Sequence, residues 1–71
     1  MHMVAEFDGI KVKIPNGYVH CGNGIYMNGH GVEYGLVSYG RGKDAVICLE
    51  TIYSKHTRTI KLEKVAHGGT P

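Results

Sequence analysis

Four residues in the middle of the chain are of the types that bind metal ions. They are two histidines and two cysteines: His20, Cys21, His30 and Cys48. Zinc is bound by such nitrogen and sulfur ligands, usually through pairs two to four residues apart. The only close pair here is adjacent, and adjacent side chains on a strand point to opposite faces. We therefore expect no metal site and no cofactor, unless the fold brings all four residues together.

The serines and cysteines are also the candidates for nucleophilic catalysis. Neither Ser38 nor Ser54 lies in a Gly-x-Ser-x-Gly turn. Cys21 points away from its neighbouring histidine, and Cys48 lies in the most apolar run of the chain, where burial keeps a thiol protonated. Other titratable groups show no pairing in the sequence: His20, His30, His56, Asp8, Glu33 and Asp44. We predict no catalytic residue and expect that the protein is not an enzyme.

Glycine is unusually frequent, at 11 of 71 residues, and glycine-rich loops can hold phosphate. A P-loop requires Gly, four residues, and then Gly-Lys-Ser/Thr. Here Gly42 and Lys43 are followed by Asp44, and Val37 occupies the place of the first glycine. No Gly-x-Gly-x-x-Gly fingerprint for dinucleotides is present either. We expect that the glycines serve turns and bends of the backbone.

Basic and aromatic residues at the predicted turns are the best candidates for a binding surface. In a small barrel, two loop tips can lie at the same rim, where cations neutralise phosphates and rings stack on bases. The alternative is that charged loop tips only favour solubility, since the net charge of +2 is below that of strongly basic binders. The candidate binding residues are Arg41, Lys43, Lys55, Arg58, Tyr39 and Tyr53.

Length and composition limit where such a surface can lie. Seventy-one residues form at most one domain, which we place at residues 1–67 with a frayed tail at 68–71. The longest apolar run, Ala45 to Leu49, is too short to span a membrane. We expect no secretory signal after Met1, and two cysteines are too few for a disulfide framework. We therefore expect a cytoplasmic protein whose thiols are reduced and largely buried.

The first predicted element is a hairpin. Asp8-Gly9 suits a two-residue type I′ turn, because both central positions require a positive φ. Folding there pairs Met3 with Ile14, Ala5 with Val12, and Phe7 with Ile10, and all six side chains then lie on one face. The next strand is short, from Tyr18 to Cys21. The segment Gly22–Gly31 contains four glycines, so we predict a mobile loop there and no strand between Ile25 and Met27.

The second half of the chain reads as further strands and turns. We predict a strand from Val32 to Tyr39 with a bulge or bend at Gly35, a turn over 40–44, and a central buried strand over 45–49. Strands over 51–54 and 57–62 flank a hairpin turn at Lys55-His56. Helical spacing of apolar residues over 62–66 allows one C-terminal helical turn. The fold class is therefore all-β, a small barrel or sandwich of five to seven short strands.

The middle of the chain resembles small SH3-like barrels of the KOW and Tudor kind. The resemblance covers about fifty residues and lies in Gly17-Tyr-Val-His-Cys21, Gly31-Val-Glu-Tyr-Gly35-Leu-Val37, Ala45 to Leu49, and Thr59 to Val65. The chain departs from the family in its glycine-rich loop and in the lack of a Gly-Asp start to its first strand. No aromatic cage of the Tudor type can be assigned. The resemblance implies a binding module for RNA, protein tails, or the transcription and translation machinery.

Two functions follow as expectations. The first is a non-catalytic interaction module that presents basic loops to RNA, DNA or a protein partner and does not contact membranes. The second is a homo-oligomeric accessory protein, of the kind that viruses and phages encode, which assembles through strand edges. Three apolar residues without a clear place in a monomer core favour the second: Val4, Tyr26 and Met27.

Overall fold

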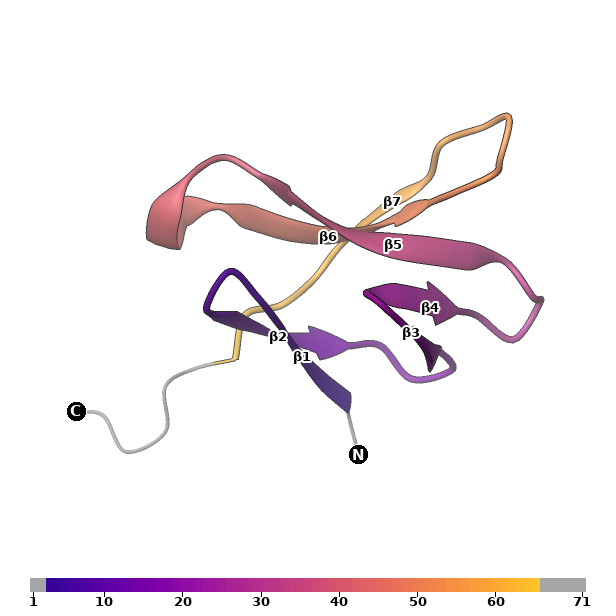
Figure 1. Cartoon of the computed structure of the whole chain (residues 1–71), viewed down its shortest axis with the longest axis horizontal. Coiled ribbons are helices and arrows are strands. Elements are labelled where there is room, and N and C mark those ends of the chain that lie inside the picture. The colour runs from indigo at the N-terminus through magenta and orange to yellow at the C-terminus, as the bar shows by residue number, and fades with distance from the viewer. Residues whose placement is uncertain (1–2, 66–71) are drawn as a thin grey trace.

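The fold is known from a computed structural model that describes residues 3–65. Within these residues the chain is all-β, with seven strands in two antiparallel sheets and a single short 3-10 turn, η1. Their bounds are β1 Met3–Phe7, β2 Ile10–Ile14, β3 Val19–Gly22, β4 Ile25–Met27, β5 Glu33–Tyr39, η1 Gly42–Asp44, β6 Val46–Thr51 and β7 Thr59–Lys61. β1 and β2 form one sheet, and β3 to β7 form the other in chain order (Figure 1). The predicted fold class is confirmed, and the part of the chain described here has no helix that could cross a membrane.

The N-terminal hairpin has the predicted register. Met3 pairs with Ile14, Ala5 with Val12, and Phe7 with Ile10. The turn has positive φ at both central positions, +51° at Asp8 and +80° at Gly9, as a type I′ turn requires. One face of the hairpin is therefore apolar and available for packing, as the alternation of side chains predicts.

The glycine-rich segment is not a single mobile loop, and that prediction is wrong. Asn23 and Gly24 form a second tight turn with positive φ at both positions, and it joins β3 to β4. β4 has only three residues, but it pairs with β3 on one side and with β5 on the other. Its central residue, Tyr26, is only 4% exposed. Pairing on both sides and burial of this ring compensate for the shortness of the strand.

β5 and β6 form the longest strand pair of the molecule. The predicted buried strand over 45–49 is confirmed, since β6 lies between β5 and β7 and contributes the buried Ile47, Cys48 and Leu49. The bulge predicted at Gly35 is not present, because the register continues unshifted from Tyr34 to Tyr39. A register shift occurs instead in β3, between His20 and Gly22. The predicted turn after β5 contains η1.

A hairpin does surround Lys55-His56, but its strands are β6 and β7 and its loop is longer than the predicted turn. β6 ends at Thr51 and β7 covers only Thr59 to Lys61, so the strand predicted over 51–54 is wrong. One backbone hydrogen bond closes the base of the loop, because Thr51 N donates to Arg58 O at 3.0 Å. The first loop residue is also held to β5, since Ile52 N donates to Glu33 O at 3.1 Å.

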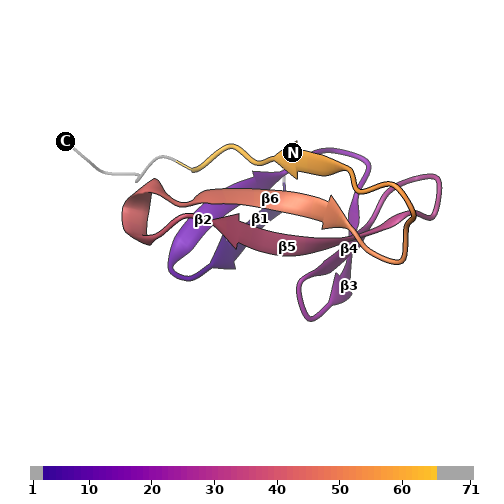
Figure 2. The same cartoon turned by 90° about the horizontal axis from the view of Figure 1, so that it is seen from above.

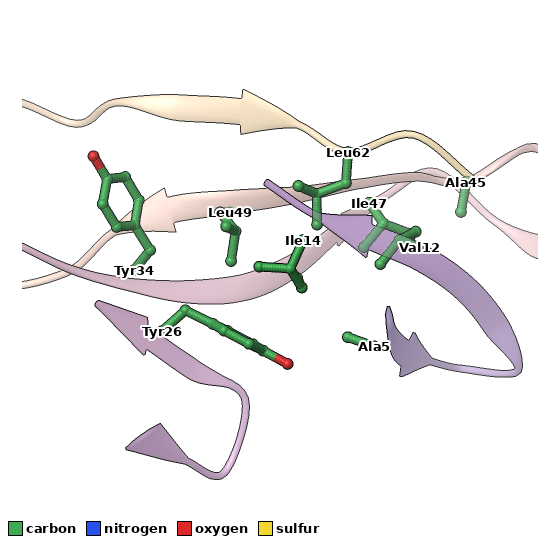
Figure 3. Packing of buried hydrophobic residues seen from close by; sticks show 9 residues of the cluster. All are labelled: Ala5, Val12, Ile14, Tyr26, Tyr34, Ala45, Ile47, Leu49 and Leu62. Atoms are coloured by element: carbon green, nitrogen blue, oxygen red, sulfur yellow. The ribbon is translucent and has the colours of Figure 1, made fainter. Parts of the chain in front are cut away.

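The two sheets are stacked as layers with one core between them. Figures 1 and 2 show the β1–β2 hairpin lying against the face of β5 and β6. Val12 and Ile14 of β2 are fully buried and are directed at Ile47 and Leu49 of β6 (Figure 3). The buried hydrophobic cluster comprises Ala5, Val12, Ile14, Tyr26, Tyr34, Ala45, Ile47, Leu49 and Leu62.

The segment after β7 connects the two sheets through hydrogen bonds. Leu62 N still donates to Ile47 O of β6 at 2.9 Å, whereas Val65 N donates to Lys11 O of β2 at 2.9 Å. Residues 62–65 are thus extended and not helical, and the rest of the predicted helical turn and the predicted tail lie outside the described residues. Among residues 3–65, β1 and β3 each pair on one side only. The strand pairs therefore form an open, two-layer arrangement of the sandwich kind.

Candidate functional site

The six predicted binding residues do not share one surface. Arg41 and Lys43 lie on the loop that precedes β6, whereas Tyr53, Lys55 and Arg58 lie on the loop that follows it. The two loops are at opposite ends of β6, as Figure 1 shows. The expectation that both tips lie at one rim is wrong, because both hairpins share this strand.

The first of these loops forms one wall of a cleft. The cleft has a volume of about 940 Å³ and lies between the β1–β2 turn, the β5–β6 loop and the segment after β7. Four cationic residues line it, together with a single carboxylate from Asp8. The cationic residues are Lys11, Arg41, Lys43 and Lys64. We call this feature the basic cleft.

Hydrogen bonds hold the walls of the basic cleft together. The Lys64 ammonium group donates to the carbonyl oxygen of Lys43 at 2.6 Å, which links the segment after β7 to the β5–β6 loop. Ala45 N donates to Gly42 O at 3.2 Å within that loop. Gly40 has a φ of +98°, and a Cβ there would lie 3.4 Å from the Ala45 Cα. The loop therefore requires glycine at this position.

Two of the four cleft cations were not among the predicted binding residues. Lys11 alternates with the apolar residues of β2 and therefore lies on the opposite face of the hairpin, which is the sequence signal for its position. Lys64 reaches the cleft because the chain after β7 is extended and bonds to β2. Its position depends on a contact between segments about fifty residues apart, which local patterns do not reveal.

The second loop, residues 52–58, presents an aromatic ring and three basic side chains. Tyr53 is 93% exposed, and Lys55, His56 and Arg58 are also exposed. The backbone is fixed from within, because Ser54 Oγ donates to His56 O at 2.9 Å and Arg58 N donates to Thr51 Oγ1 at 2.9 Å. We call this feature the tyrosine loop.

Tyr39 belongs to neither feature. Its hydroxyl donates a hydrogen bond to Glu50 Oε1 across the sheet. This bond to a carboxylate, with minor contributions from burial and from the negative charge, raises the pKa of the Tyr39 hydroxyl above its ordinary value. Because the hydroxyl is engaged within the sheet, we remove Tyr39 from the candidate binding surface.

The histidines and cysteines do not form a metal site among residues 3–65, where no group of three potential ligands lies close enough together. His20 stacks on Tyr26 with ring centroids 4.8 Å apart. Cys48 is buried as predicted, but Cys21 is exposed, so the expectation that both thiols are buried is wrong. Cys21 lies on β3, which within residues 3–65 pairs only with β4.

Comparison with known proteins does not assign the chain to a family. No family model matches it, and no curated protein or solved structure is similar to it at a significant level. The functional argument therefore rests on the basic cleft and the tyrosine loop themselves.

Proposed function

We propose that the protein is a non-catalytic module that binds the phosphate backbone of a nucleic acid in the basic cleft. The observation that carries the proposal is the convergence of Lys11, Lys64 and the β5–β6 loop from three distant parts of the sequence. Surface charges that serve only solubility need no such convergence and are usually mixed in sign.

The chemistry of the cleft favours phosphate over other anions. The Arg41 guanidinium can contact two phosphate oxygens at once, and lysine ammonium groups act as point charges beside it. The Ser38 hydroxyl, which also lines the cleft, adds a neutral hydrogen-bond donor. The cleft is open, so a continuous chain can pass through it. These features support a polyanionic chain as ligand.

Salt dependence of binding tests the proposal. Each cation that contacts a phosphate of a single strand contributes about 0.7 to the slope of log K against log salt concentration. We expect Lys43→Ala to weaken binding of a fluorescent single-stranded oligonucleotide and to make this slope shallower by about 0.7. The matched control is Lys61→Ala, because Lys61 is also exposed but lies outside the cleft on β7.

Two results would contradict the proposal. One is equal binding and equal slopes for the Lys43 and Lys61 variants. The other is binding of polyglutamate in place of nucleic acid, which would assign an acidic protein as the partner.

A second candidate function, homo-oligomerisation, is favoured by the outer edges of β1 and β3, which no other strand within residues 3–65 covers. Each edge carries exposed apolar side chains, with Val4 52% and Val19 58% exposed, and unpaired strand edges are templates for pairing with another chain. Tyr26 no longer supports this candidate because it is buried. Light scattering over a dilution series separates the two functions, since a 7.8 kDa species at every concentration excludes assembly.

We also propose that the fold is an opened SH3-like barrel in a cytoplasmic protein. The passage of residues 62–65 from β6 to β2 supports the proposed barrel, because small barrels close through strands that serve two sheets.

The free thiols of Cys21 and Cys48 support the proposed cytoplasmic location, because reducing compartments keep thiols reduced.

A further inference from the structure

The tyrosine loop holds Tyr53 in a conformation that neither packing nor backbone preference explains. The φ of Tyr53 is +57°, which is unfavourable for a bulky side chain. Its ring is 93% exposed and therefore gains little from burial. Strained residues of this kind persist where the surrounding structure fixes them, and they cluster at sites of function.

The surrounding structure does fix the loop. Thr51 bonds to Arg58 through both its backbone N–H and its hydroxyl, and Ser54 Oγ also accepts a hydrogen bond from His56 N at 3.2 Å. The ring is thus presented to solvent on a preorganised backbone, which reduces the entropy cost of binding a partner.

The charges of the loop restrict what the ring can bind. Residues 52–58 include three basic side chains and no acidic one, so an anionic partner is complementary. An acidic peptide would use the cations but has no need of an exposed ring. An unpaired nucleotide uses both, because its base stacks on the ring and its phosphate is neutralised by the flanking cations.

We propose that Tyr53 is a stacking platform for an unpaired nucleic-acid base, with Lys55 and Arg58 as contacts for the adjacent phosphates. This inference deepens the proposed function, on which it rests for the class of partner, and specifies a single-stranded ligand. The proposed platform lies at the other end of β6 from the basic cleft, so the platform and the cleft can be tested and rejected separately.

The test uses the absence of tryptophan from the chain. Tyr53→Trp places a single tryptophan at the platform. We expect its fluorescence to be quenched by a thymidine oligonucleotide of about 16 residues, but not by an abasic chain with the same number of phosphates. We expect Tyr53→Ala to weaken binding of the thymidine oligonucleotide by about 5- to 150-fold. Tyr53→Phe, which retains the ring, should bind like the unaltered protein.

Three outcomes would overturn the inference. The first is equal quenching by the thymidine and abasic chains together with unchanged oligonucleotide binding in Tyr53→Ala. This result would rule out the stacking platform, whereas weaker binding in Lys43→Ala would still support the basic cleft. Loss of polyglutamate binding in Tyr53→Ala, without loss of oligonucleotide binding, assigns an acidic protein to the loop. Failure of the unaltered protein to bind any oligonucleotide removes both proposals. Weaker oligonucleotide binding in Tyr53→Ala but not in Lys43→Ala would support the stacking platform and rule out the basic cleft as a binding site.

Discussion

Tyr39 and Tyr53 are both exposed tyrosines beside a loop, yet their surroundings differ completely. The hydroxyl of Tyr39 is bound to Glu50, whereas Tyr53 projects from a strained backbone into solvent. The sequence could predict that both lie near turns, because turn residues follow each of them. It could not distinguish them. The hydrogen bond of Tyr39 joins residues on neighbouring strands, and a positive φ is expected from the sequence at Gly, Asn or Asp but not at a tyrosine such as Tyr53.

The hydrogen bond of Tyr39 predicts a change in stability at high pH. The raised pKa of Tyr39 means that its neutral form is favoured by folding. The stabilisation is therefore complete below the unfolded pKa of about 10 and is lost as pH rises through the higher folded value. We expect the stability difference between the unaltered protein and Tyr39→Phe to shrink over that range in denaturant titrations.

Glu50→Gln is the control for this prediction. Removing the carboxylate charge should lower the pKa of Tyr39 toward its ordinary value, which phenolate absorbance can follow by difference from the same titration of Tyr39→Phe. An unchanged Tyr39 titration in Glu50→Gln would show that Glu50 does not control this group.

At the scale of elements, local turn chemistry predicts the hairpins well. The Asp8-Gly9 turn was predicted with its strand register, because a two-residue turn determines which residues pair. The sequence does not indicate β4, although Asn23-Gly24 is the same kind of turn, because three residues show too little periodicity to indicate a strand. What makes β4 a strand is the pairing on both sides and the burial of Tyr26, and both are non-local.

This account of β4 predicts a large effect of removing its central side chain. Tyr26→Ala should lower the free energy of unfolding by about 3–5 kcal/mol, as for other buried aromatic residues. A domain of this size has a total stability of roughly 4–10 kcal/mol, so the variant is expected to be partly unfolded. The measurement is urea denaturation followed by circular dichroism.

The same substitution at Tyr53 is the matched control. Its ring is almost fully exposed, so Tyr53→Ala should change the free energy of unfolding by less than about 0.5 kcal/mol. Equal effects of the two substitutions would contradict the assignment of β4 to the core.

At the scale of the whole molecule, both sheets share one hydrophobic core. The sequence could identify the apolar faces of the strands, but not how the layers are joined. The extended segment 62–65 contains apolar residues at helical spacing, and its bonds to Lys11 and Lys13 override that local pattern. The same contact brings Lys11 and Lys64 to the basic cleft, so the site could be predicted only in part.

A shared core predicts that the hairpin and the larger sheet unfold together. All five tyrosines lie between residues 18 and 53, outside the β1–β2 hairpin. Ile14→Val in the hairpin should cost about 0.5–1.5 kcal/mol and should shift the tyrosine fluorescence midpoint as far as the circular dichroism midpoint. A shift confined to circular dichroism would show that the hairpin melts separately.

The position of β6 between two basic loops has a consequence for avidity. A ligand that engages the basic cleft and the tyrosine loop at once must reach from one end of β6 to the other, because the two features lie at opposite ends of this strand (Figure 1). Shorter oligonucleotides can occupy only one end at a time and gain nothing from the other. Once a strand reaches both ends, the second contact becomes intramolecular and the affinity rises without any new interaction. Affinity should therefore increase abruptly at a threshold length that is determined by the rigid span of this central strand.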